Sequence, residues 1–259
     1  MKIGITVLGS GSSGNALLIH SENSAILVDA GFSRKEMLAR FATVGIDPAI
    51  IKGLLITHEH GDHVKGARVL ADHLDIPTFL TPQAYKHLHT RNLVGQKVHV
   101  FDTGSPFTVD IFNIHPFVVP HDAMDPVGFA FFANEMKIGV VTDLGHVNNL
   151  VKARLMECDA LILECNHDVK MLRNSDRSIN LKRRILGRFG HLNNEDAINS
   201  LDELLHPKTK HLVLYHLSGE CNCPDKVAEL ATAKLANLNR QDVSYQIAKQ
   251  HVPMETMWL

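Results

Sequence analysis

The sequence predicts an α/β protein in which two β-sheets are sandwiched between helices. Short apolar runs typical of strands recur along the chain, and helical patterns separate many of them. The N-terminal half is rich in strands with hairpin signals, whereas the C-terminal half alternates strand and helix. No linker, repeat or break in composition divides the 259 residues. We therefore expect one domain over residues 1–259.

The elements follow from the spacing of apolar residues in each segment. Asn134 and Glu135 stand between two apolar runs, which predicts a hairpin. The predicted strands lie at 3–8, 15–20, 25–28, 53–57, 98–101, 111–119, 127–133, 136–142, 159–164, 211–215 and 243–248. The predicted helices lie at about 33–43, 64–74, 147–156, 193–205 and 225–237.

Composition narrows the class of protein. Apolar residues make up 45% of the chain, enough for a packed core. The formal net charge is −2, so the protein as a whole does not attract nucleic acid, and any site for a polyanion must be local. The start resembles no secretory signal, and no apolar run reaches the roughly 18 residues of a membrane span. Four cysteines give no disulfide framework. We expect a cytoplasmic protein without a membrane partner; its oligomeric state is not indicated.

Residues 10–15, Ser-Gly-Ser-Ser-Gly-Asn, have the composition of a phosphate-binding loop. They lack the Lys-Ser/Thr ending and the strand–loop–helix context of such loops. A tight glycine-rich hairpin is the favoured interpretation, and a loop that lines an active site is the alternative.

The most informative segment is Thr-His-Glu-His-Gly-Asp-His at 57–63, directly after the apolar run 53–56. With a strand before it and a helix from about Val64, His58 and His60 leave the chain on the same side. Asp62 and His63 follow on the turn and reach a second point. One loop can thus serve two metal ions about 3.5–4 Å apart, and its donors suit zinc, manganese or iron(II). Chance clustering among 17 histidines is the alternative.

Three further candidate ligands stand where strands are predicted to end. His121, Asp143 and His216 each come just after an apolar run. Open α/β sheets place their chemistry at the carboxyl ends of strands. Each residue taken alone is better explained as an ordinary polar loop residue, but their order along the chain favours ligands.

The order His-X-His-X-Asp-His, His, Asp, His resembles that of the metallo-β-lactamase-fold hydrolases, over the whole chain. The resemblance implies an αββα four-layer sandwich and two divalent metal ions. It implies that one ion is held by His58, His60 and His121, the other by Asp62, His63 and His216, and that Asp143 bridges them. It further implies that a water between the ions is the nucleophile, which Asp62 orients or deprotonates. Residues 28–31, Val-Asp-Ala-Gly, resemble the turn whose aspartate braces the metal loop.

Three later segments (161–167, 190–195 and 214–218) are similar to motifs of ribonuclease Z-like phosphodiesterases. That similarity implies that Glu164 orients His191, which acts as general acid; a helix-capping role for His191 is the alternative. Segments 8–15, 164–168, 182–186 and 190–197 resemble the WalJ/YycJ-type branch, which implies a cytosolic 5′-to-3′ DNA exonuclease. The chain departs from that branch between Leu172 and Lys182, where no aromatic residue stands.

A run of basic residues precedes His191. Seven lysines and arginines fall between Lys170 and Arg188, which predicts a basic helix that contacts a phosphate backbone. A solvated helical face is the alternative. The candidate substrate-binding residues are Lys182, Arg183, Arg184, His167 and Asn193.

The sequence therefore predicts a dinuclear metal-dependent phosphodiester hydrolase whose substrate is nucleic acid, most simply DNA. One alternative is a phosphodiesterase for a small molecule such as a cyclic nucleotide or a sugar phosphate. Others are a thioester or lactone hydrolase, which needs no pairing of Glu164 with His191, and a scaffold without activity.

Overall fold

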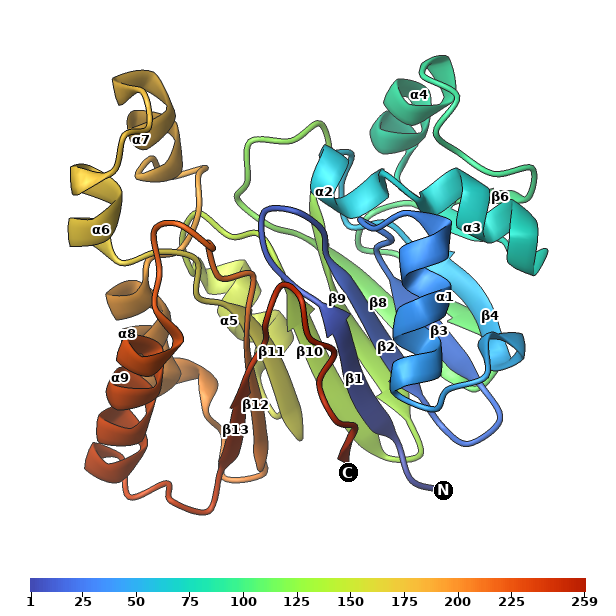
Figure 1. The fold of residues 1–259 in the computed structure, drawn as a ribbon. Coiled ribbons are helices and arrows are strands. Elements are labelled where there is room, and N and C mark those ends of the chain that lie inside the picture. The colour runs from blue at the N-terminus through green and yellow to red at the C-terminus, as the bar shows by residue number, and fades with distance from the viewer.

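The structure, a computed structural model, describes residues 1–259. Two seven-stranded sheets face each other, and helices cover the outer side of each sheet, which gives four layers (Figure 1). The predicted αββα sandwich is confirmed. No helix has the length and apolar composition that crossing a membrane requires.

The first sheet contains the N-terminal strands and the C-terminal end of the chain. Its order is β14 (Met257–Trp258), β1 (Gly4–Gly9), β2 (Ala16–His20), β3 (Ala25–Val28), β4 (Ile51–Leu55), β5 (Thr78–Leu80) and β6 (Val98–Val100). Its helices are α1 (Arg34–Thr43), α2 (Gly61–Val64), α3 (Ala67–Leu74) and α4 (Pro82–Thr90), with a short 3₁₀ turn at Pro48–Ile50.

The second sheet carries the rest of the chain. Its order is β13 (Ser244–Ile247), β12 (His211–Tyr215), β11 (Ala160–Glu164), β10 (Met136–Val141), β9 (Val127–Ala133), β8 (Phe112–Val118) and β7 (Phe107–Val109). Its helices are α5 (Asn149–Leu155), α6 (Val169–Asn174), α7 (Ile179–Ile185), α8 (Asn194–Leu204) and α9 (Pro224–Asn237).

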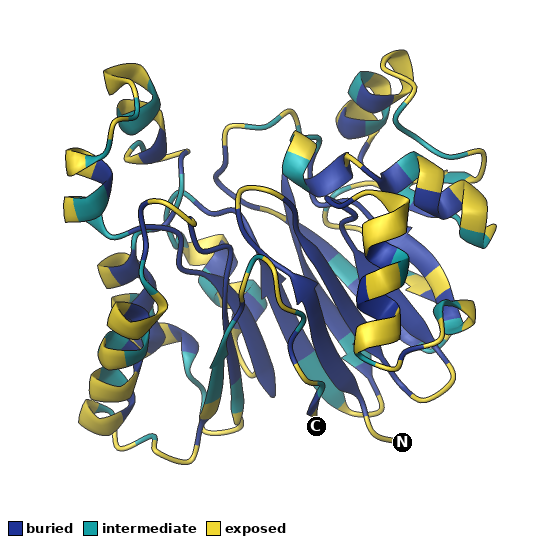
Figure 2. Cartoon of the chain, in the orientation of Figure 1, coloured by how far each residue is buried: buried dark blue, intermediate teal, exposed yellow.

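Apolar side chains fill the space between the layers. Residues of both sheets, including Val7, Phe129 and Ile162, form one buried cluster between them. Phe41 lies in the cluster under α1 and α3, and Leu201 in the cluster under α8 and α9. Figure 2 shows the result, with buried strands inside and exposed faces on the outer helices. This packing fixes the strand ends, from which the site is built.

Several strands end at the same edge of the sandwich. β10, β11 and β12 are parallel neighbours, and β8 runs in the same direction because it is antiparallel to β9, which is antiparallel to β10. The residues after these strands are therefore neighbours. Among them are His121, Asp143 and His216, with Glu164 as the last residue of β11.

The predicted hairpin at 134–135 is confirmed. β9 and β10 pair antiparallel with Ala133 opposite Met136. Asn134 and Glu135 both have positive φ angles, of 46° and 67°, as a two-residue turn of the type that matches the twist of the strands requires.

The predicted helix from about Val64 differs from the structure. Helix α2 begins at Gly61, so Asp62 and His63 lie in a helical turn, and α3 begins separately at Ala67. The break comes at Gly66, whose N–H donates to the carbonyl oxygen of Ala30. A Cβ at Gly66 would lie 1.8 Å from the carbonyl oxygen of Phe32, so the chain packs too closely there for a side chain.

The predicted basic helix is wrong as a single element. Residues 170–188 form two short helices, α6 and α7. Helix α6 ends at Ser175. The Ser175 hydroxyl donates to the carbonyl oxygen of Leu172, and this bond takes the place of a further helical turn. Ser178 then caps the start of α7 by accepting from the backbone N–H of Leu181. Helix α4 was not predicted from the sequence, and neither were the strands β5, β7 and β14, which have only two or three residues each and are too short to show a period.

Candidate metal centre and active site

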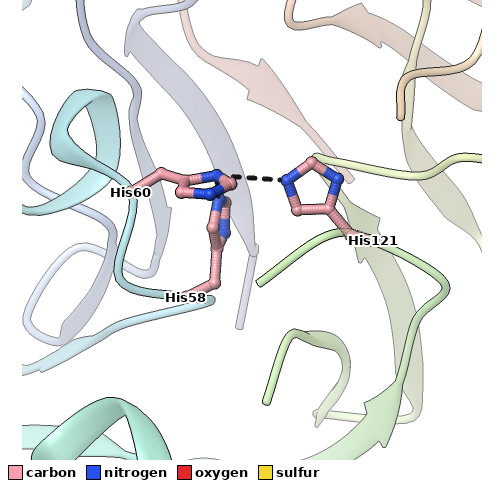
Figure 3. A group of neighbouring side chains, drawn as sticks. All are labelled: His58, His60 and His121. Atoms are coloured by element: carbon pink, nitrogen blue, oxygen red, sulfur yellow. Dashed lines mark hydrogen bonds between the residues drawn. The ribbon is translucent and has the colours of Figure 1, made fainter. Parts of the chain in front are cut away.

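Three histidines form the first group of possible metal ligands. Nε2 of His58 lies 3.0 Å from Nδ1 of His60, which lies 3.2 Å from Nε2 of His121. Figure 3 shows these rings meeting, two from the segment after β4 and one from the segment after β8. Contributions from both sheets mean that the site forms only when the sandwich is assembled.

A second group lies beside the first. Oδ2 of Asp62 is 3.4 Å from Nε2 of His63 and 3.3 Å from Nε2 of His216. Asp143 connects the two groups, since its Oδ2 lies 3.1 Å from Nε2 of His63 and its Oδ1 lies 3.6 Å from Nε2 of His121. The structure thus brings together all seven residues that the sequence singled out as ligands.

Two of these histidine rings are held from behind by an acceptor. Nδ1 of His63 contacts Asp29 Oδ2 at 2.7 Å, and Nδ1 of His121 contacts the carbonyl oxygen of Gly190 at 3.0 Å. Because a carboxylate or carbonyl oxygen can only accept, the Nδ1 atoms carry the protons, and Nε2 is left free to bind a cation. This arrangement is typical of metal-binding histidines.

The donors fit a pair of divalent cations. Burial lowers the pKa of His58 and His60, with a further contribution from neighbouring imidazoles, and this favours the neutral form that binds metal. Oδ2 of Asp143 is buried and has no hydrogen-bond partner, so this oxygen is available to a cation. Imidazole and carboxylate are ligands of zinc, manganese and iron alike.

Asp29 braces the metal loop, as the resemblance implied. It has a φ angle of 61°, which turns its carboxylate toward the segment after β4. That carboxylate accepts from the backbone N–H of Thr57 at 2.9 Å, from the Thr57 hydroxyl at 2.8 Å and from His63. It thereby fixes both the start of the loop and the orientation of one ligand.

Replacing Asp29 with asparagine is expected to weaken metal binding about 10–100-fold, the usual effect of losing an acceptor behind a ligand histidine. An amide at this position presents only one acceptor oxygen to Thr57 and His63. Titration of the metal-free protein with Zn²⁺ in a competition assay measures the effect. Asp47→Asn, which alters an exposed capping carboxylate far from the site, is the control; equal affinities of the two variants would contradict a bracing role.

Glu164 is fully buried and accepts four hydrogen bonds. Its Oε2 accepts from the backbone N–H groups of Leu144 at 2.8 Å and Leu192 at 2.9 Å. Its Oε1 accepts from Nδ1 of His191 at 2.7 Å and Nδ1 of His216 at 2.9 Å. The structure therefore places Glu164 against His191, as the resemblance implied, and also against a candidate metal ligand, His216, which was not expected.

His191 does not cap the next helix. Asn193 does, by accepting from the backbone N–H of Asp196. Burial would lower the pKa of His191, but the Glu164 carboxylate outweighs burial and the pKa is raised. With Nδ1 held by Glu164 and the residue lining a cavity, Nε2 is the ring atom available to a substrate.

A polar cavity of about 310 Å³ opens over the two ligand groups. Only two of its twelve lining residues are hydrophobic. Its walls are formed by Ser12, His60, Gly61, Asp62, Asp143, Asn166, Arg177, Leu181, Arg184, Ile185, His191 and His216. A cavity of this kind suits a charged ligand rather than an apolar one.

Of the five predicted substrate-binding residues, only Arg184 lines this cavity. Its guanidinium pairs with Asp122 and lies 3.5 Å from Nε2 of His60. Arg183 is exposed nearby, while the Lys182 ammonium donates to the carbonyl oxygens of Arg173 and Ser175 and so ties α7 to α6.

The two remaining candidates for substrate binding, His167 and Asn193, do not line the cavity. His167 is buried with an unpartnered Nε2, and burial lowers its pKa to about 4. Asn193 is the cap of α8 described above. Arg177, which the sequence counted only as part of the basic run, lines the cavity instead and pairs with Glu220 at 3.1 Å.

The loop at 10–15 connects the antiparallel strands β1 and β2 and also forms part of the cavity wall, so both interpretations of it hold. Nδ2 of Asn15 donates to Asp62 Oδ2 at 3.2 Å, and its Oδ1 accepts from the backbone N–H of Gly11 at 2.9 Å. This role was not predicted from the sequence. The asparagine that ends the glycine-serine run was its only local signal.

The sandwich and the His/Asp groups at its edge define a metal-dependent hydrolase. The chain belongs to the metallo-β-lactamase superfamily, since the family model described as beta-lactamase superfamily domain matches residues 24–217. It is 37% identical to exodeoxyribonuclease YycJ of Bacillus anthracis, over 86% of this chain and 85% of that protein. It is 33% identical to exodeoxyribonuclease WalJ of Streptococcus pneumoniae, over 90% and 86% of the two chains.

Solved structures confirm the fold. YhfI of Bacillus subtilis, a metallo-β-lactamase fold protein, superposes with a TM-score of 0.74 at 17% identity and covers 98% of each chain. Zinc-bound PqqB of Methylobacterium extorquens superposes with a TM-score of 0.70 at 16% identity, over 98% of this chain and 100% of that one. The predicted fold family is thus confirmed, and the identities with YycJ and WalJ confirm the resemblance to the WalJ/YycJ-type branch.

Proposed function

We propose that this protein is a two-metal exodeoxyribonuclease that degrades DNA in the 5′-to-3′ direction. The observation that carries the proposal is the meeting of two ligand groups at Asp143, under a cavity that also presents His191. The two curated relatives, both named exodeoxyribonucleases, support DNA as the substrate because they align with most of the chain.

In this proposal His58, His60 and His121 hold one cation, Asp62, His63 and His216 hold the other, and Asp143 contacts both. When bound, two such cations supply Lewis acidity to phosphoryl oxygens and lower the pKa of a water. Asp62 lines the cavity and is 24% exposed in its side chain, so its carboxylate is accessible to the attacking water.

We assign His191 as the general acid, which donates the proton that the leaving oxygen requires. The hydrogen bond from its Nδ1 to Glu164 fixes the ring, so that Nε2 faces the substrate. When the bond between phosphorus and the leaving oxygen breaks, Nε2 donates a proton to that oxygen. Glu164 stays ionised and holds the ring in place throughout.

Arg177 and Arg184 supply the positive charge that a phosphate backbone needs. Both line the cavity, and each is paired with a carboxylate, Glu220 and Asp122 respectively. Substrate phosphates can exchange with these surface carboxylates, because such pairs contribute little to stability. Arg183 extends the positive surface outward.

Digestion of end-labelled single-stranded and duplex DNA with added Mn²⁺ tests the proposal. We expect label to be released early from the 5′ end and late from the 3′ end, and Asp143→Asn to abolish release. Raising salt from about 50 to 200 mM should lower kcat/KM roughly 10- to 20-fold if about three phosphates of a single strand are contacted. Early release from the 3′ end would contradict the polarity.

Hydrolysis of bis-p-nitrophenyl phosphate provides the comparison. Turnover of this compound without any DNA degradation would favour a small phosphodiester as substrate. Turnover of thioesters or lactones in place of either would contradict phosphodiester chemistry altogether.

A further inference from the structure

Phe189 is 60% exposed although it is a large apolar side chain. The chain exposes one other large aromatic residue, Trp258, at 44%. Phe189 lies in the turn between α7 and His191, two residues before the proposed general acid. Two residues span at most about 7 Å, so this exposed ring is anchored next to the cavity.

The backbone on either side of Phe189 is held firmly. Nδ1 of His146 contacts the carbonyl oxygen of Arg188 at 2.9 Å, and Nδ1 of His121 contacts that of Gly190 at 3.0 Å. A Cβ at Gly145 would lie 2.1 Å from the carbonyl oxygen of Arg188, so the turn packs directly on the segment after β10. The exposed ring is therefore part of the same rigid unit as a candidate metal ligand.

The surroundings of Phe189 are positively charged. Arg183, Arg184 and Arg188 are all exposed in the same stretch of chain. The cavity itself offers only Leu181 and Ile185 as apolar wall, and no phenyl, phenol or indole ring. A strand whose phosphates enter the cavity thus finds its nearest large aromatic surface at Phe189.

We propose that Phe189 is a stacking platform for a nucleobase of single-stranded DNA, at a nucleotide next to the one being cleaved. The identity of the occupant rests on the proposed function. Aromatic faces between arginines bind single strands with little sequence preference, because every base has a π-face. Since the turn is already rigid, little order has to be gained on binding.

Binding of two oligonucleotides tests the proposal. Both carry the same number of phosphates, made resistant to cleavage as phosphorothioates, but one has thymine bases and the other is abasic. Fluorescence anisotropy should show the wild-type protein binding the thymine strand roughly 5- to 150-fold more tightly, the range for one base–aromatic stack. Phe189→Ala should remove most of this preference, and Trp258→Ala, the matched exposed aromatic residue, should keep it.

A second measurement reports on the ring directly. The chain has one tryptophan, so F189W in a W258F background carries a single fluorophore at the proposed platform. Its emission should be quenched by the thymine strand and not by the abasic strand. Equal binding of both strands by the wild-type protein, or equal quenching by both, would overturn the proposal.

The outcome is separable from that of the proposed function, because binding is measured without turnover. A concentration-dependent dimer that Phe189→Ala abolishes in size-exclusion chromatography would instead show that the ring is covered by a second copy of this chain, and would overturn the proposal.

Discussion

Replacing His191 with alanine is expected to slow DNA cleavage about 10²–10⁴-fold, the usual contribution of a general acid or base. The leaving oxygen of a nucleotide is an alkoxide and needs a proton as its bond to phosphorus breaks. A nitrophenolate leaves without one. We therefore expect His191→Ala to slow hydrolysis of bis-p-nitrophenyl phosphate far less than hydrolysis of DNA, as measured by kcat on each substrate.

The contrast between the two substrates separates a proton donor from a structural histidine. Asp143→Asn serves as the reference, because loss of a residue that contacts both ligand groups should slow both substrates alike. If His191→Ala slowed both substrates to the same degree, His191 would act through the metal centre, and its assignment as general acid would be wrong.

The ligand groups could be predicted from the sequence because their signals are local. The His58–His63 segment carries four donors within six residues, and the period of a strand decides which of them share a side. His121, Asp143 and His216 could be recognised by their position after apolar runs. Since those runs are buried strands, packing of the core decides where the following residue stands.

The remaining parts of the site depend on pairing between distant segments. Glu164 lies opposite Tyr215 in the register of β11 and β12, and the next residue, His216, has a φ angle of 60°. This register and the left-handed turn bring the imidazole to the carboxylate of Glu164. No pattern within either strand indicates the contact between Glu164 and His216. The contact between Asn15 and Asp62 is likewise indicated by no pattern within either segment.

The function of the basic residues at 170–188 could also be predicted only in part from the sequence. Its charge could be counted from the sequence, but the direction of each side chain could not. Lys182 is used to join α6 and α7, whereas Arg177 faces the cavity. The break between the two short helices decides this, and it results from the hydroxyls of Ser175 and Ser178 bonding to nearby backbone groups, which compete with a continuous helix.

Glu164→Gln is expected to impair two functions at once, because one carboxylate oxygen serves both His191 and His216. A glutamine side chain has one acceptor oxygen, and its NH₂ group can only donate. It cannot accept from both rings on one atom and from the N–H groups of Leu144 and Leu192 on the other. We expect metal affinity to fall about 10–100-fold, through His216, and kcat on DNA at saturating metal to fall as well, through His191.

Combining Glu164→Gln with His191→Ala separates these two effects. In the absence of the His191 ring, Glu164 can no longer position the proton donor, so the second substitution should lower kcat at saturating metal little further. Metal affinity should still fall, since His216 remains and loses its acceptor. Glu195→Gln, which alters an exposed carboxylate in the first turn of α8, is the control. Fully additive losses in kcat would mean that Glu164 stabilises the site independently of His191, whereas unchanged metal affinity would mean that His216 does not need its acceptor to bind the cation.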